Sequence, residues 1–106
     1  MKATLQFNLP EDQSEFNAAL KGADALGALF DVRQEVFRPA RKHGYSDPNL
    51  TLLLTSINTL IENAADHSGW PRDEYGQLMV AEDIIYLLER RFTTILENHN
   101  LTSEDI

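Results

Sequence analysis

The first residues of the chain alternate polar and apolar side chains with a period of two. In residues 2–9, KATLQFNL, the side chains of Thr4 and Gln6 are polar, and those of Leu5 and Phe7 are apolar. Strict alternation is typical of a β-strand with one buried face. We therefore expect a short strand over residues 2–9, and no later segment shows a convincing second strand pattern.

The rest of the chain follows a helical period, with apolar residues recurring at steps of three and four. Asp47 and Pro48 form a start signal, because Asp favours the N-cap and Pro the first helical position. Near the end, Asn98 or Asn100 can adopt the left-handed cap that closes a helix. The expected helices cover about residues 11–21, 24–38, 48–68 and 72–98, and residues 102–106 form a frayed tail.

These elements predict one domain over residues 1–106 of the mainly α (α+β) class, a short N-terminal strand followed by three to four helices in an antiparallel bundle. A lone strand leaves its backbone N–H and C=O groups without partners. It can pair with its twin in a homodimer, add to the sheet edge of another protein, or lie over the helices with a hydrated backbone. We favour pairing between two copies through Thr4, Leu5, Gln6 and Phe7.

Composition narrows the class of protein. The 106 residues suffice for one modest core, and the chain has no cysteine for disulfides or zinc sites. A net charge of −8 argues against direct binding to nucleic acid and suits a partner with a basic surface, although it also serves solubility. No apolar run approaches the roughly 20 residues of a membrane span and the N-terminus lacks a signal-peptide core, so we expect a cytoplasmic protein.

Residues 2–22, KATLQFNLPEDQSEFNAALKG, resemble the opening of a family of small phage and prophage proteins of the form KATLxFNLPED followed by EF. Matching positions as far as about residue 44 are Ala28, Leu29, Asp31, Val32, Arg38, Arg41 and Lys42. The resemblance implies a phage or prophage origin and a role inside the host cell, and it brings no catalytic residues. Residues 48–69 and the loop at Trp70 depart from the shorter family pattern.

Two features are candidates for binding. The basic patch of Arg38, Arg41, Lys42 and His43 can hold phosphate or an acidic surface. We favour a structural role for it, in which the cations complement a helix C-terminus, because no aromatic stacking pattern or glycine-rich loop accompanies them. Trp70 can anchor a partner, although a loop tryptophan more often packs over the helix ends that it joins.

Four carboxylates are weak candidates for a metal site: Glu62, Asp66, Glu82 and Asp83. Glu62 and Asp66 share a helix face, and the other two lie on the next helix, so a divalent ion can bind between them. The paired E-x-x-E and E-x-x-D spacings of all-α phage nucleotide pyrophosphatases are missing, and a solvated helix face is the favoured interpretation. The three histidines and the serines form no catalytic motif, so we expect no metal, no cofactor and no enzymatic activity.

The sequence therefore favours a small acidic phage-type protein that acts by protein–protein interaction. Its expected target is a host nucleic-acid-binding or defence factor, such as a restriction or CRISPR component, which it inhibits or modulates during infection or from a prophage. The alternatives are a metal-dependent nucleotide hydrolase of the all-α type and an accessory protein of phage replication or recombination.

Overall fold

A computed structural model describes residues 1–102 and 104, and the rest of the expected tail, residues 103, 105 and 106, lies outside the described residues. As predicted, the described chain is mainly helical, with α1 (Gln13–Val32), α2 (Pro48–Asn63) and α3 (Ala81–Asn98). A π-helical turn, η1 (Arg33–Phe37), and a 3₁₀ turn, η2 (Arg38–Arg41), continue α1. These described residues contain no sheet, and they show one isolated β-bridge, between Arg72 and Leu78.

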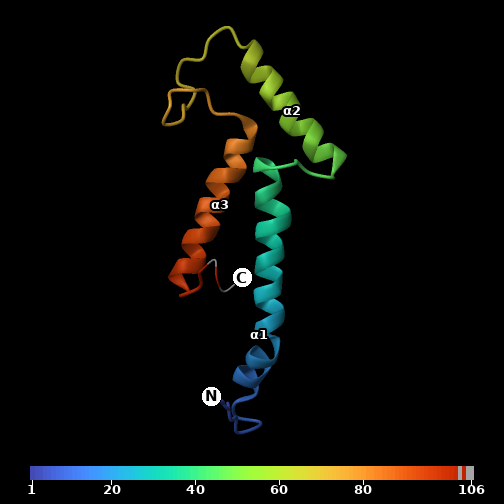
Figure 1. The fold of residues 1–106 in the computed structure, drawn as a ribbon, viewed down its shortest axis with the longest axis vertical. Coiled ribbons are helices and arrows are strands. Elements are labelled where there is room, and N and C mark those ends of the chain that lie inside the picture. The colour runs from blue at the N-terminus through green and yellow to red at the C-terminus, as the bar shows by residue number, and fades with distance from the viewer. Residues whose placement is uncertain (103, 105–106) are drawn as a thin grey trace.

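The helices form an open, elongated molecule (Figure 1). α3 runs antiparallel to α1 beside its C-terminal half, α2 leans away at the far end, and the N-terminal part of α1 projects on its own. The chain measures 66 × 29 × 28 Å, and its radius of gyration is 20.3 Å. A compact domain of this length has a radius of gyration of about 13 Å. The closed antiparallel bundle expected from the sequence is therefore not confirmed.

Residues 2–9 have no regular secondary structure. The segment turns back on α1: the N–H of Asn8 donates to the Asp12 carboxylate at 2.9 Å, and the N–H of Asp12 donates to the Asn8 carbonyl at 2.7 Å. The Phe7 ring meets that of Phe16 edge to face, with centroids 5.6 Å apart. A strand needs a neighbouring strand to bond its backbone groups. The described single chain offers none, so the predicted strand is absent from it.

The helices expected over residues 11–21 and 24–38 are joined, because α1 passes through Gly22 without a break. A glycine that ends a helix adopts a positive φ, and Gly22 is not among the glycines with a positive φ. The alanines around it favour the helix enough to offset its cost. The regular helix is disrupted only before Pro39, whose ring and missing N–H prevent a normal helical bond.

α2 begins where the sequence predicts. The Asp47 carboxylate accepts hydrogen bonds from two N–H groups of the first turn, and Pro48 occupies the first helical position. The helix ends at Asn63, short of the expected residue 68. The cause is local, because the chain turns extended at Ala64, and the Ile61 carbonyl accepts the Ala64 N–H at 3.3 Å and also lies 2.7 Å from a ring nitrogen of His67.

α3 begins at Ala81, nine residues later than the predicted start near residue 72. Residues 73–77 form a tight turn, in which the Asp73 carboxylate accepts two backbone N–H groups at 2.9 Å each and Gly76 has a φ of 79°. The predicted C-terminal cap is confirmed, since Asn100 has a φ of 59° and the N–H of Leu101 donates to a carbonyl of the last turn.

The core is small. In the described residues the buried apolar side chains are Pro39, Ile61, Ala81 and Leu96. The accessible surface is 8684 Å², whereas a compact monomer of this mass exposes roughly 6,000 Å². Many leucine, isoleucine and aromatic side chains thus remain in contact with solvent. None of the helices in this part of the chain has the length and apolar character needed to cross a bilayer.

Candidate functional site

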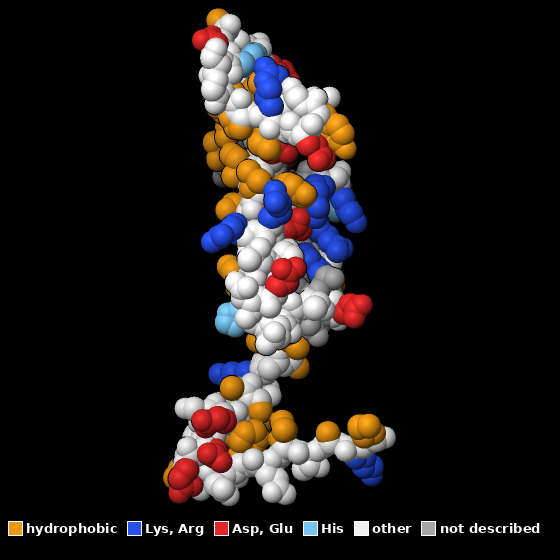
Figure 2. Space-filling view, turned by 90° about the vertical axis from the view of Figure 1, so that its left-hand side faces the viewer, with side chains coloured by type: hydrophobic (Ala, Val, Ile, Leu, Met, Phe, Trp, Pro, Cys, Tyr) orange, Lys and Arg blue, Asp and Glu red, His pale blue; other side chains and the backbone are white. Residues whose placement is uncertain are grey.

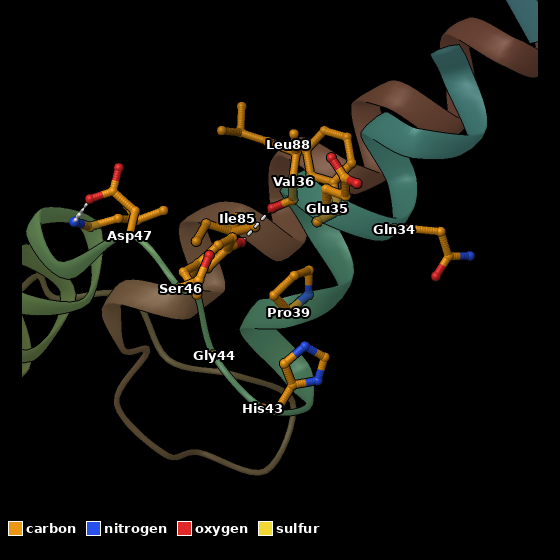
Figure 3. Close-up of a pocket in the computed structure, with 13 residues that line it drawn as sticks. Gln34, Glu35, Val36, Pro39, His43, Gly44, Ser46, Asp47, Ile85 and Leu88 are labelled. Carbon is orange, nitrogen blue, oxygen red and sulfur yellow. Dashed lines mark hydrogen bonds between the residues drawn. The ribbon is translucent and has the colours of Figure 1, made fainter. Parts of the chain in front are cut away.

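An open hollow of about 740 Å³ lies where η1, η2, the following loop, the start of α2 and α3 meet (Figure 3). We call it the central groove. Its apolar lining comes from four elements, η1, η2, α2 and α3, and its polar lining includes acidic and imidazole groups. The residues that define it here are Val36, Pro39, Leu50, Ile85 and Leu88, together with Glu35, His43 and Asp47. Of these, Leu88 is 55% exposed, which makes the groove accessible to a partner.

Local contacts hold the walls of the central groove in place. The rings of Phe37 and Phe92 pack with centroids 5.2 Å apart, which joins η1 to α3. The Tyr45 hydroxyl donates a hydrogen bond to the Val36 carbonyl, and the Thr51 hydroxyl donates to the Tyr45 carbonyl at 3.0 Å. The loop between η2 and α2 is therefore tied to both of its neighbours.

Tyr45 has a shifted acidity. Burial raises the pKa of its hydroxyl above the ordinary 10.0, the backbone hydrogen bond to Ala40 opposes this, and the charges of Glu89 and Glu82 add to the rise. The hydroxyl consequently stays protonated at neutral pH. It serves as a hydrogen-bond donor to the backbone rather than as a base.

Arg41, a member of the predicted basic patch, is bound within the chain. Its Nη2 lies 2.5 Å from Oε1 of Glu89, whose side chain is almost fully buried at 8% exposure. The Arg41 guanidinium also lies 5.6 Å from the centre of the Tyr86 ring. This ion pair links η2 to α3. The sequence offers no local signal for Glu89 as the partner.

The other three residues of the basic patch do not converge on one point. Arg38 donates to the Gln34 side chain at 3.4 Å, a bond within one helical turn. Lys42 and His43 are exposed, and His43 borders the central groove. Lys42 and the His43 imidazole therefore remain on the surface, and of the two only His43 lines the groove.

The structure does not bring the four candidate carboxylates together. Glu82 accepts hydrogen bonds from the Asn58 amide at 2.9 and 3.2 Å, and Asp83 accepts one from the N–H of Val80 at 2.7 Å. Asp66 accepts an N–H two residues further on at 2.8 Å, and Glu62 is exposed. In residues 1–102 and 104, no three acidic, histidine or cysteine side chains form a group that could hold a metal ion.

Trp70 packs over the end of α2 and remains 44% exposed. Its indole N–H donates to the Met79 carbonyl at 3.0 Å, and its ring borders a second hollow of about 320 Å³ with Ile57 and Leu60. The residue thus has a structural contact and still presents a partly free ring.

The predicted pairing residues Thr4, Leu5 and Gln6 are exposed at the N-terminus, where Phe7 is half-buried.

Sequence reasoning misses the central groove. Leu50, Ile85 and Leu88 occupy apolar helix positions that predict burial, yet they face a hollow. The signals that could have marked the site are the two prolines at positions 39 and 48, which bound the bend between η2 and α2. The angle of this bend depends on contacts with residues far away in the sequence, such as those of α3, and the local sequence pattern does not contain this information.

Comparison with known proteins identifies no relative from which a function could be inferred. No family model, no curated protein and no solved structure matches the chain. The resemblance of residues 2–22 to small phage and prophage proteins therefore stays a prediction, and function has to be argued from the geometry.

Proposed function

We propose that this protein acts by binding another protein. The observation that supports the proposal most strongly is the open apolar surface: few apolar side chains of the described chain are buried, and the total surface exceeds that of a compact monomer by roughly 2,700 Å². The exposed large apolar side chains include Leu20, Leu60 and Leu88, and clusters of such side chains on a protein surface mark interaction sites. The central groove is the best-formed part of this surface.

Charge indicates the chemistry of the partner. Residues 47–102 carry nine carboxylates and three arginines, and Glu35 and Asp47 line the central groove. A partly apolar, basic surface complements this arrangement, and complementary potentials raise both specificity and the association rate. Basic surfaces of this kind are typical of nucleic-acid-binding proteins.

The phage-type resemblance extends the proposal to a setting. In that setting the protein works in the cytoplasm of a host cell and occupies the nucleic-acid-binding surface of a host factor, such as a restriction or CRISPR component. The extended N-terminal segment before Asn8 gives a second contact, because such a segment becomes a strand when it meets a sheet edge. The hydrolase and the replication accessory protein remain predictions of the sequence alone.

A pulldown from host lysate tests the proposal. Wild-type protein is expected to recover a nucleic-acid-binding protein that added DNA displaces. Leu88→Asp, which places a charge in the central groove, is expected to reduce recovery at least tenfold. Leu52→Asp, a change on an exposed part of α2 that does not line the groove, is expected to leave recovery unchanged. Failure to recover such a protein at low and at physiological salt contradicts the proposal.

A further inference from the structure

An apolar stripe runs along α1 and lies outside the central groove. Its residues follow steps of three and four, so they share one side of the helix. They are Phe16, Ala19, Leu20, Ala23, Leu26 and Phe30, and we call them the α1 stripe. No residue of α1 is buried, and Leu20 and Phe30 are 64% and 41% exposed. Apart from Phe16, which packs against Phe7, the stripe makes no ring contact or tight packing that buries it within the described chain.

A helix of this kind requires packing. α1 has 20 residues, about 30 Å of helix, and most helical stability in proteins comes from burial of an apolar face. α3 packs against the continuation of the helix in η1, where Phe37 contacts Phe92, and not against α1 itself. Below that point the helix projects alone, and Figure 2 shows a narrow neck between this projecting arm and the rest of the molecule.

The distribution of charge identifies the partner of the stripe. The first 31 residues carry five carboxylates and two lysines, whereas residues 32–46 carry four cations and one carboxylate. In Figure 2 several acidic side chains lie on the projecting arm, which also carries basic side chains at its tip and its neck, and most lysine and arginine side chains lie around the middle of the molecule among some acidic ones. If a second copy lies antiparallel, its acidic arm meets the basic middle of the first. A parallel copy places acid against acid.

The exposed area agrees with a second copy. The excess of roughly 2,700 Å² per chain is more than one side of a permanent dimer needs, because such dimers bury about 2,000–5,000 Å² in total. The stripe contains alanines at positions 19 and 23, so two helices can approach closely along it. Shape, area and charge thus point to the same occupant.

We propose that two copies of this chain associate through their α1 stripes, with the two helices antiparallel and residue 23 near the two-fold axis. Glu11, Asp12 and Glu15 at the start of each α1 then lie level with residues 31–35 of the other copy, where the basic segment begins with Arg33 between Asp31 and Glu35. The interface leaves the central groove free, so it does not depend on the proposed binding function. It also sends the two N-terminal segments to opposite ends of the dimer, which excludes strand pairing between them.

Sedimentation equilibrium with matched variants tests the interface. The wild-type chain of 12.0 kDa is expected to sediment at twice that mass. Leu20→Asp is expected to weaken the dimer at least 100-fold, because each copy would place an unpaired carboxylate in an apolar interface. Leu52→Asp, at an equally exposed leucine of α2, is expected to leave the dimer intact. The Trp70 fluorescence of each variant reports whether the α2–α3 end stays folded.

Two further measurements distinguish the arrangement from its alternatives. A chain that lacks residues 1–9 remains dimeric in the proposed arrangement and becomes monomeric if the strands pair. The chain has no cysteine, so a spin label on Ser14→Cys occupies one site in each copy. The labels are expected about 27 Å apart along the helix axis in the antiparallel pair, and parallel helices would bring them side by side. A wild-type monomer, a monomer after truncation, loss of the dimer in Leu52→Asp, or the short label distance overturns the proposal.

Discussion

The contact between Arg41 and Glu89 links two segments that lie far apart in the chain. Glu89 is nearly buried on α3, whereas Arg41 on η2 is half-exposed and also lies over the Tyr86 ring. A buried carboxylate is tolerated when a cation compensates its lost hydration. The basic patch therefore contributes to the fold through Arg41, while Lys42 and His43 remain on the surface.

Arg41→Ala tests this role. The change removes the cation and leaves the Glu89 carboxylate without its ion-pair partner, so we expect the free energy of unfolding to fall by about 1–3 kcal/mol. Arg91→Ala, at an exposed position of α3, is expected to change it by less than about 0.5 kcal/mol. Urea unfolding of the two variants measures the difference, and equal effects of the two changes would contradict a specific role for the ion pair.

Tyr45 gives the protein a pH dependence in the alkaline range. Burial raises its pKa in the folded chain, so the unfolded chain releases this proton first. The resulting stabilisation is complete below pH 10 and is lost as the pH rises through the higher folded pKa. Tyr45→Phe should therefore lose less stability than the wild type between pH 9 and 11. Tyr75→Phe, at a residue 82% exposed, is the control and should follow the wild type.

At the level of elements, local signals determine where helices start and stop. Asp47 with Pro48 begins α2, and Asn100 closes α3, and both follow from the preferences of single residues. The late start of α3 also has a local cause, the turn that Asp73 and Gly76 form, and the spacing of these two residues is a recognisable turn signal. Such features are predictable from the sequence in principle.

Other features depend on partners distant in sequence or in another molecule. The strand pattern of residues 2–9 is genuine, but a strand forms only where a second strand accepts its hydrogen bonds. The candidate carboxylates Glu82 and Asp83 share a helix with the ion-paired Glu89, yet they bond Asn58 and Val80 instead of a metal. The period of apolar residues in the sequence predicts on which face of a helix or strand a residue lies. It does not predict which other residues or molecules cover that face.

Gly22 tests whether α1 is continuous in solution. It lies inside the helix, and a Cβ atom built on it has no other atom within 4 Å. Gly22→Ala is therefore expected to stabilise the protein by about 0.5–1 kcal/mol, seen as a higher midpoint of thermal unfolding. Gly76→Ala, at a φ of 79°, should destabilise it instead. A destabilising Gly22→Ala would indicate two separate helices.

The molecule as a whole is open and elongated, and its helices pack against one another over only part of their length. α3 covers the upper end of the long helix, α2 leans outward, and the acidic arm extends alone (Figure 1). A single chain of this form exposes more apolar surface than monomeric proteins usually leave in water. We propose that two interfaces cover this surface. The α1 stripe binds a second copy of the chain, and the central groove binds a partner with a basic surface.

The most direct test of the central claim is amide hydrogen exchange of residues 16–25. The claim is that α1 packs against the α1 of a second copy of the chain. In the dimer these amides exchange by dissociation, so their protection is expected to rise about threefold for each tenfold increase in protein concentration. The amides of α2, a helix that packs against α3 within one chain, provide the internal control with protection independent of concentration. Rapid exchange of residues 16–25 at every concentration, or protection that does not change with concentration, would contradict the account.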